Sequence, residues 1–172
     1  MPAIITEYPQ FFTATNLNWK KLLQPDKYKD IIIDSLSFLV KDRRIRLYAF
    51  VIMSNHIHLI WQMFPFIEAK AVQRDFLKYT AQFIKRDLLK CHPKVLKYFK
   101  VDAKDRVYQF WERNPLSIEL RTAKVFQQKL DYIHWNPVRA GICRYPEEYK
   151  YSSAFFYETG IDNWGFLTHS RG

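Results

Sequence analysis

The sequence has 172 residues, of which 48% are hydrophobic and only four are glycine. This suits one folded domain with a full core and excludes a disordered or loop-dominated chain. The 27 basic and 17 acidic side chains give a net charge of +10, which favours a polyanionic partner, nucleic acid first, although a basic surface also serves solubility alone. Aromatic residues, at 17%, favour nucleic acid further because their rings stack on unpaired bases.

Targeting signals and cysteines bear on the compartment. The N-terminus has no basic segment followed by a long apolar one, and no apolar run approaches the ~20 residues that span a bilayer. Cys91 and Cys143 are too few for a disulfide framework and fit a reducing compartment. We therefore expect a cytoplasmic protein with no membrane partner. We expect one domain over residues 1–172, with a core at about 8–142 and a wrapping C-terminal segment at about 143–172.

The first third of the chain predicts a strand, a turn, a helix and a β-hairpin. Strand-forming residues cover 8–15, a turn follows at 16–18, a helix runs from Pro25-Asp26 to about Val40, and two strands cover 45–53 and 56–63. Ser54-Asn55 makes the tight turn of the hairpin.

The second hairpin strand begins with His56-Ile57-His58. Residues two apart on a strand point to the same face, so the two imidazoles project together while Ile57 faces a core. Paired imidazoles on a rigid strand are two-thirds of a divalent-metal site, which needs one more ligand.

A second helix is predicted over about residues 67–89, after Pro65. Its apolar residues recur at helical spacing and predict a core stripe made of Val72, Phe76, Tyr79 and Phe83. A second stripe is basic and made of Lys70, Arg74, Lys78 and Lys85. This stripe is either the solvated side of the helix or a surface that faces phosphates, since like charges four residues apart repel unless something neutralises them.

The remaining chain predicts a loop or short irregular helix over 91–107, a strand over 107–111, a turn at Asn114-Pro115 and a third helix from about Thr122. This helix should end at Asn136, because Pro137 disfavours helical geometry in the residue before it. The tail reads as extended chain with a short helix. This order of elements indicates an α+β fold, a ferredoxin-like or RRM-like sandwich in which helices cover one face of an antiparallel sheet.

The third helix carries the second half of the candidate site. Its core stripe is Phe126, Leu130 and Ile133, while Gln128, Tyr132 and Asn136 share a neighbouring face. Asn136 offers a hard carbonyl oxygen for Mg²⁺ or Mn²⁺, and Tyr132 offers a phenol that can act as a covalent nucleophile. Alone, each is more often a helix end or a packing residue; their combination with His56 and His58 points to a catalytic site.

Two segments of this chain resemble a known family. Residues 49–60 resemble the His-hydrophobe-His strand of the single-tyrosine HUH transposases, in the IS200-like superfamily. Residues 130–141 resemble their nucleophile helix, and the form Tyr-Ile-His-x-Asn-Pro-Val is most similar to the REP-associated tyrosine transposases. Gln109 to Arg113 and Tyr149 to Ala154 are supporting matches.

This resemblance implies an HUH-type domain that nicks and rejoins single-stranded DNA, often beside a hairpin, through a 5′-phosphotyrosine link. It implies Tyr132 as the nucleophile, His56 and His58 as metal ligands and Asn136 as the third ligand, with Mg or Mn as the cofactor. The partner would be single-stranded or hairpin DNA, and the protein would be nucleoid-associated when bound to it. Residues 16–20 lack the Asn-Arg pair expected of the family, and 91–107 match no motif, which leaves the mode of DNA recognition open.

Basic residues that could line the DNA path are Lys70, Arg74, Lys78, Arg113, Lys129 and Arg139. They would contact phosphates without reading sequence. Lys129 also has the charge and the helical position to favour the Tyr132 phenolate. Trp111 and Trp135 are either stacking or core residues, and His134 is either structural or DNA-facing.

Two rival functions are a non-catalytic nucleic-acid-binding module on the same fold and a hydrolase that uses the two histidines as acid and base. The module would bind single strands whether or not a chelator is present. The hydrolase would need carboxylates or a second His motif aimed at the same spot, and the sequence offers neither. The DNA target, the choice between monomer and homodimer, and the use of Tyr132 within or across subunits stay open at this stage.

Overall fold

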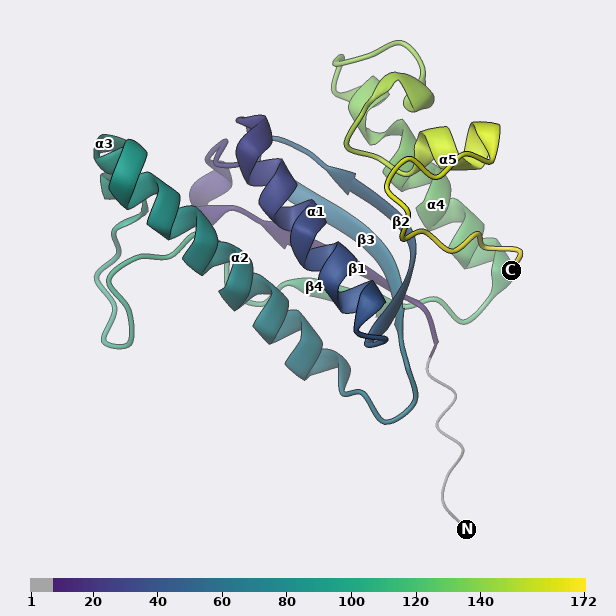
Figure 1. Cartoon of the computed structure of the whole chain (residues 1–172), viewed down its shortest axis with the longest axis horizontal. Helices are drawn as coiled ribbons and strands as arrows, with labels where there is room; N and C mark the ends of the chain where they lie inside the picture. Colours follow the sequence, from purple (N-terminus) through teal and green to yellow (C-terminus); the bar gives the residue numbers. More distant parts are fainter. Residues whose placement is uncertain (1–7) are drawn as a thin grey trace.

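The computed structural model describes residues 8–172 and is shown in Figure 1. In chain order its elements are β1 (Gln10–Thr15), α1 (Asp26–Lys41), β2 (Ile45–Ile52), β3 (His56–Met63), α2 (Ala69–Cys91), α3 (Pro93–Leu96), β4 (Leu116–Glu119), α4 (Ala123–Arg139) and α5 (Ala154–Thr159). Single 3-10 turns cover Leu17–Trp19, Lys97–Phe99 and Pro146–Glu148. The predicted first strand, first helix and hairpin are confirmed to within two residues.

The four strands form one antiparallel sheet in the order β2-β3-β1-β4. β1 lies between β3 and β4, and its register on β3 sets Thr13 opposite His58 and Thr15 opposite His56. Cross-strand partners point to the same face of a sheet, so these four side chains share one surface. The predicted α+β fold with an antiparallel sheet is confirmed.

Helices pack on both faces of this sheet. α1 and α2 cover one face, where Ile32 and Phe76 join a core with Trp61 of β3, and Figure 1 shows both helices in front of the strands. α4 packs on the other face, where Leu130 and Ile133 join a smaller core with Ile60. The expectation of helices on one face thus holds for α1 and α2 but not for α4.

A β-bulge in β2 changes which of its residues face each core. The register of β2 on β3 shifts between Leu47 and Ala49, which leaves Tyr48 as the extra residue. Leu47 before the bulge and Phe50 after it both face α1 and α2, whereas Ala49 and Val51 face α4. One extra residue reverses the alternation of the strand, so the residues after the bulge face the opposite side from the one that their spacing to Leu47 would give.

Helix α4 continues past Asn136, contrary to the sequence-based expectation. It ends at Arg139 and contains Pro137. The proline removes one backbone donor, but the turn after it is held by the bond from Ala140 N–H to the Asn136 carbonyl, 3.0 Å. Because Pro137 lies in the last turn, the helix ends soon after this single lost bond. Gly141, at φ 75°, then ends the helix in a left-handed conformation.

The predicted strand over residues 107–111 is wrong. That segment makes only isolated bridges, at Tyr108 and Trp111, and buries Phe110 and Trp111 in the larger core. The fourth strand is β4 instead, a short edge strand whose residues are mostly exposed. An exposed edge strand needs no apolar alternation, so the sequence pattern carried no signal for it.

The predicted core stripe of α2 is wrong in its second half. Tyr79 and Phe83 are exposed, and the buried stripe continues through Thr80, Ile84 and Leu88. The true stripe keeps a strict spacing of four residues, which the polar Thr80 hides. Thr80 is satisfied in the core because its hydroxyl bonds the Phe76 carbonyl and accepts from the Trp111 indole.

The C-terminal segment runs along the edge of β2. Ile52 N–H donates to the Tyr151 carbonyl and Ser153 N–H to the Phe50 carbonyl. The two cysteines, Cys91 and Cys143, are free thiols. Within residues 8–172, the structure contains no helix with the length and apolar character to cross a bilayer.

Candidate active site and basic groove

The two histidines at the start of β3 share the face that α4 covers. Their ring centroids are 4.8 Å apart, and His58 is 5% exposed. Ile57 between them lies in the core on the opposite face, as predicted. Imidazoles at this spacing are near enough to bind the same metal ion.

Each imidazole is fixed through its Nδ1 atom. The Thr13 hydroxyl oxygen lies 2.7 Å from His58 Nδ1, and the Asn55 side-chain oxygen lies 2.7 Å from His56 Nδ1. The Asn55 amide nitrogen donates to the Trp19 carbonyl, so its oxygen is the atom that accepts from His56. Such bonds hold a ring in place and leave Nε2 as the free nitrogen, the usual environment of a metal-binding histidine.

Both rings are held neutral. Burial lowers the pKa of His56 and lowers the pKa of His58 to about 3, where the charges of His56, Lys129 and Arg139 act in the same direction. A metal ion binds the neutral imidazole, so protons compete weakly at this pair.

Tyr132 comes to the histidines from α4. Its ring centroid is 5.3 Å from that of His58, and 43% of the residue is exposed. Two cations flank the ring: Lys129 Nζ at 5.8 Å and the Arg139 guanidinium at 4.8 Å from its centroid. Arg139 Nη2 also donates to the Tyr132 carbonyl at 2.6 Å. Two positive charges therefore lie close to the Tyr132 ring.

Asn136 lies one turn beyond Tyr132 on α4 and is half-buried. Within residues 8–172, its side chain makes no hydrogen bond, and no cluster of three or more His, Cys, Asp or Glu side chains is positioned to hold a metal. A divalent ion here would therefore take two imidazole nitrogens and fill its remaining positions with amide oxygen, water or phosphate. The fixed, neutral histidines fit such an ion, and the amide of Asn136, one turn from Tyr132, offers an oxygen of the type it prefers.

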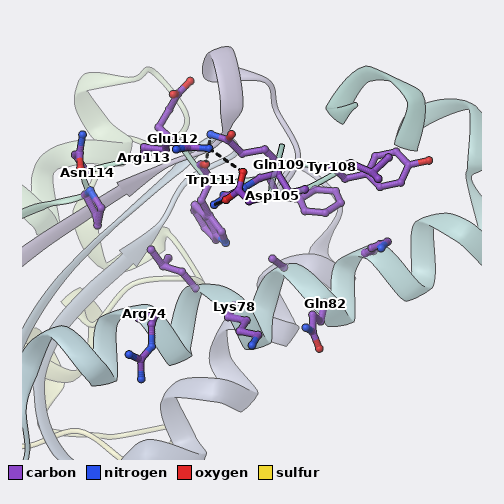
Figure 2. A pocket seen from close by; sticks show the side chains of 17 residues that line it. Arg74, Lys78, Gln82, Asp105, Tyr108, Gln109, Trp111, Glu112, Arg113 and Asn114 are labelled. Carbon is purple, nitrogen blue, oxygen red and sulfur yellow. Dashed lines mark hydrogen bonds and ion pairs between the residues drawn. The ribbon is translucent and has the colours of Figure 1, made fainter. Parts of the chain in front are cut away.

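The six predicted DNA-binding cations fall into three places. Lys129 and Arg139 flank Tyr132, as described. Arg74, Lys78 and Arg113 line a groove of about 910 Å³ between α2 and residues 105–115, shown in Figure 2. Lys70, one turn before Arg74, does not line it.

The groove also contains two further cations, Lys85 and Arg106. Its lining therefore holds five basic side chains and two acidic ones, Asp105 and Glu112.

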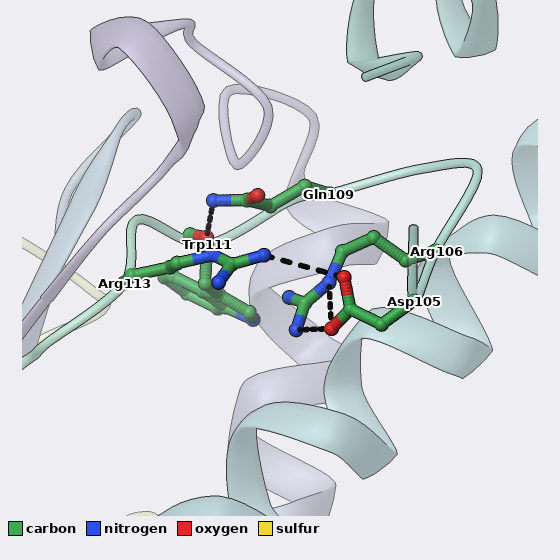
Figure 3. A network of polar contacts seen from close by, with 5 residues as sticks. All are labelled: Asp105, Arg106, Gln109, Trp111 and Arg113. Atoms are coloured by element: carbon green, nitrogen blue, oxygen red, sulfur yellow. Dashed lines mark hydrogen bonds and ion pairs between the residues drawn. The ribbon is translucent and has the colours of Figure 1, made fainter. Parts of the chain in front are cut away.

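Figure 3 shows how Asp105 organises the outer wall of this groove. Its carboxylate accepts from Arg106 Nη2 at 2.8 Å and from Arg113 Nη2 at 3.3 Å. The pKa of Asp105 is lowered, chiefly by the hydrogen bond from Arg106. The charge of Arg113 acts in the same direction. Gln109 Nε2 donates to the Trp111 carbonyl at 2.9 Å and steadies the same loop. One carboxylate thus holds both guanidinium groups at the exposed edge of the groove.

The loop that forms one wall of the groove is bonded to the end of β1. Glu112 N–H donates to the Thr15 carbonyl, and Thr15 is the cross-strand partner of His56. One backbone hydrogen bond thus links the groove wall to the strand that pairs with His56.

Three residues left open by the sequence are now placed. His134 is buried and its Nε2 lies 2.8 Å from the Ser153 hydroxyl, so it is structural. Trp111 belongs to the core, whereas Trp135 is exposed. Sequence reasoning missed Thr13 and Asn55, the partners of the imidazoles. Only the strand register brings Thr13 to His58, while Asn55 was read only as a turn residue.

Comparison with known proteins defines the fold class first. No protein-family model and no curated protein matches the sequence. The chain is similar in structure to a REP-associated tyrosine transposase bound to a REP hairpin, with a TM-score of 0.65 and 19% identity over 94% of this chain and 86% of that one. A transposase-like protein from Deinococcus radiodurans gives a TM-score of 0.49 and 12% identity over 77% and 93%, too distant to bear on the fold.

The protein thus has the fold of a REP-associated tyrosine transposase. The family resemblance that the two sequence motifs indicated is confirmed at the level of fold.

Proposed function

We propose that this protein is a transposase-type enzyme that cuts and rejoins single-stranded DNA through a covalent bond to Tyr132. One observation carries the proposal: the Tyr132 ring lies 5.3 Å from His58 of a fixed, neutral histidine pair, within one chain. The fold supports it, because a protein with this fold is a tyrosine transposase bound to a hairpin.

His56 and His58, with Asn136 as the third ligand, would hold a divalent ion, Mg²⁺ or Mn²⁺. When bound, such an ion offsets negative charge on a scissile phosphate. Thr13 and Asn55 keep the two imidazoles oriented for this role.

In the proposed reaction, the Tyr132 oxygen forms a bond to phosphorus while the bond from phosphorus to the 3′ oxygen breaks. The phenol proton is released to solvent, and the leaving 3′ oxygen takes up a proton to become a hydroxyl. Lys129 and Arg139, which both lie near the ring, would stabilise the negative charge that develops on the phenol oxygen. The phosphotyrosine bond conserves the energy of the cut bond, so a 3′-hydroxyl can reverse the step.

The DNA path we propose runs from the histidines past Glu112 into the groove. Arg74, Lys78 and Arg113 would contact phosphates there without reading sequence. Lys70 would lie beyond the groove on the same helix. Single-stranded DNA beside a hairpin is the proposed substrate, and Tyr132 would act on DNA held by the histidines of its own chain.

The test is covalent capture. Wild-type protein incubated with Mn²⁺ and a hairpin oligonucleotide that carries a single-stranded extension should form an adduct that survives a denaturing gel. Tyr132→Phe should bind the same DNA but form no adduct, because it lacks the attacking oxygen. Tyr79→Phe is the matched control, a helical tyrosine of 45% exposure on α2 that should form the adduct normally.

The rival reading, a non-catalytic nucleic-acid-binding module, predicts a different pattern. It gives no adduct with any divalent ion, and its binding ignores a chelator. An undiminished adduct in Tyr132→Phe, or metal-dependent cleavage by His56→Ala, would refute the proposed chemistry.

A further inference from the structure

Trp19 is the most exposed tryptophan in the described part of the chain, and the proposed reaction does not use it. It exposes 64% of its surface, although tryptophan usually buries most of its area. Its ring centroid lies 6.2 Å from that of His56, with the rings at 67°. A large flat ring therefore stands open to solvent at the rim of the histidine pair.

The backbone that presents this ring is strained. Asn18 has φ 53° and Trp19 has φ 57°, so two consecutive non-glycine residues adopt the left-handed region. Bulky side chains rarely adopt it, and such strain persists only where the surroundings impose it.

The surroundings that impose it also hold His56. Trp19 N–H donates to the Asn16 carbonyl at 3.0 Å, and the wholly buried Asn16 donates through its own N–H to the Asn55 carbonyl at 2.8 Å. The Asn55 amide then donates to the Trp19 carbonyl while its oxygen accepts from His56. On the other side, Asn18 N–H donates to Glu112 at 2.6 Å. One bonded unit thus fixes both the imidazole and the tryptophan backbone.

We propose that Trp19 is a stacking platform for the unpaired base next to the scissile phosphate. The inference rests on the proposed function, which places that phosphate at the histidines. A base attached to the neighbouring sugar would meet the exposed Trp19 face, and ring faces bind unpaired bases of any sequence. The exposed cation Lys21, two residues on, favours the passing phosphate backbone. Trp19 would position the strand between the histidines and Glu112, where the groove begins.

The test measures binding without cleavage, in the Tyr132→Phe background with Mg²⁺, by fluorescence anisotropy. The probes are a blunt hairpin and the same hairpin with a single-stranded pyrimidine extension. Trp19→Ala should weaken binding of the extended probe about 5- to 100-fold, the range for losing one base–aromatic stack. Trp19→Phe should retain most of the affinity, and neither change should affect the blunt hairpin.

Phe66→Ala is the matched control. Phe66 is fully exposed, has φ 68°, and follows the far end of β3, so it shares the exposure and the backbone conformation but not the location. It should bind both probes as the parent does. Trp19→Gly relieves the backbone strain. It should lose affinity for the extended probe, while its melting temperature stays the same or rises.

Several results would overturn the platform. The first is that Trp19→Ala binds the extended probe as tightly as the parent does. The second is that it loses affinity equally for both probes. The third is that its loss of affinity accompanies a change from dimer to monomer, measured by sedimentation. Failure of the tyrosine chemistry looks different: wild type would form no adduct, while the Trp19-dependent affinity for the extension would persist.

Discussion

At the scale of single residues, the environment of the two candidate metal ligands depends on two small polar side chains. Thr13 and Asn55 each bond an Nδ1 atom, and burial keeps both rings neutral. His134 shows that burial alone does not make a ligand. It too has a pKa lowered by burial, but its Nε2 is engaged by Ser153. Within residues 8–172, the Nε2 atoms of His56 and His58 have no such partner, which distinguishes them from His134.

Thr13→Val tests this arrangement. The change keeps the shape of the side chain but removes the oxygen that orients His58, so we expect Mn²⁺ affinity, measured by isothermal titration calorimetry, to fall about 10-fold or more. Thr15→Val is the control, because Thr15 lies opposite His56 on the same strand and, among the described residues, its hydroxyl bonds neither imidazole. Equal affinities in the two variants would contradict an orienting role for Thr13.

At the scale of elements, α4 decides where Tyr132 lies. Leu130 and Ile133 attach the helix to the sheet, and His134 attaches it to the C-terminal segment through Ser153. Ser153 in turn bonds β2 through Phe50. The helix is therefore held on two sides, which fixes the exposed Tyr132 beside His58.

The His134 attachment predicts acid sensitivity. Burial lowers the pKa of His134 to about 4, below the ordinary value of 6.5, so the unfolded chain binds the proton more tightly. Stability should fall as the pH drops below 6.5, with the loss complete near pH 4. For this residue the free energy of unfolding should drop by about 2 kcal/mol between pH 7.5 and pH 5.

Urea unfolding of metal-free protein at the two pH values measures this drop. His134→Gln keeps a donor for Ser153 but does not titrate, so its drop should be smaller than the wild-type drop by that amount. His58 contributes to both proteins in the same direction and cancels in the comparison. An identical pH dependence in the two proteins would show that His134 is not held neutral in the fold.

At the scale of the whole molecule, basic side chains cluster in the groove beside α2. The groove beside α2 concentrates five cations, and its end at Glu112 lies next to the strand pair that carries His56. The groove lies on the face of the sheet that α1 and α2 cover, and Tyr132 lies on the opposite face.

Salt dependence tests the groove as part of the DNA path. Removing two phosphate contacts with the double variant Arg74→Ala and Lys78→Ala should reduce the slope of log K against log salt for a single strand by about 1.4. The matched control, Arg86→Ala with Lys90→Ala, removes two exposed cations of α2 outside the groove and should leave the slope nearly unchanged. Equal slopes in the two double variants would remove the groove from the path.

The sequence by itself determined the local elements and the chemical residues. Apolar periodicity predicted the hairpin and the long helices, and the His-Ile-His spacing put two imidazoles on one face, because a strand alternates with a period of two. Errors arose where the local pattern was weak: the exposed β4, the stripe interrupted by Thr80, and the proline inside α4.

Only the tertiary structure decided which of these residues meet. The register of β1 on β3 brought Thr13 to His58 across 45 positions of sequence. The second face of the sheet is apolar, and α4 packs there and carries Tyr132 to the histidines. Such contacts depend on pairing between distant segments, and the pattern of any one segment contains no information about its partner.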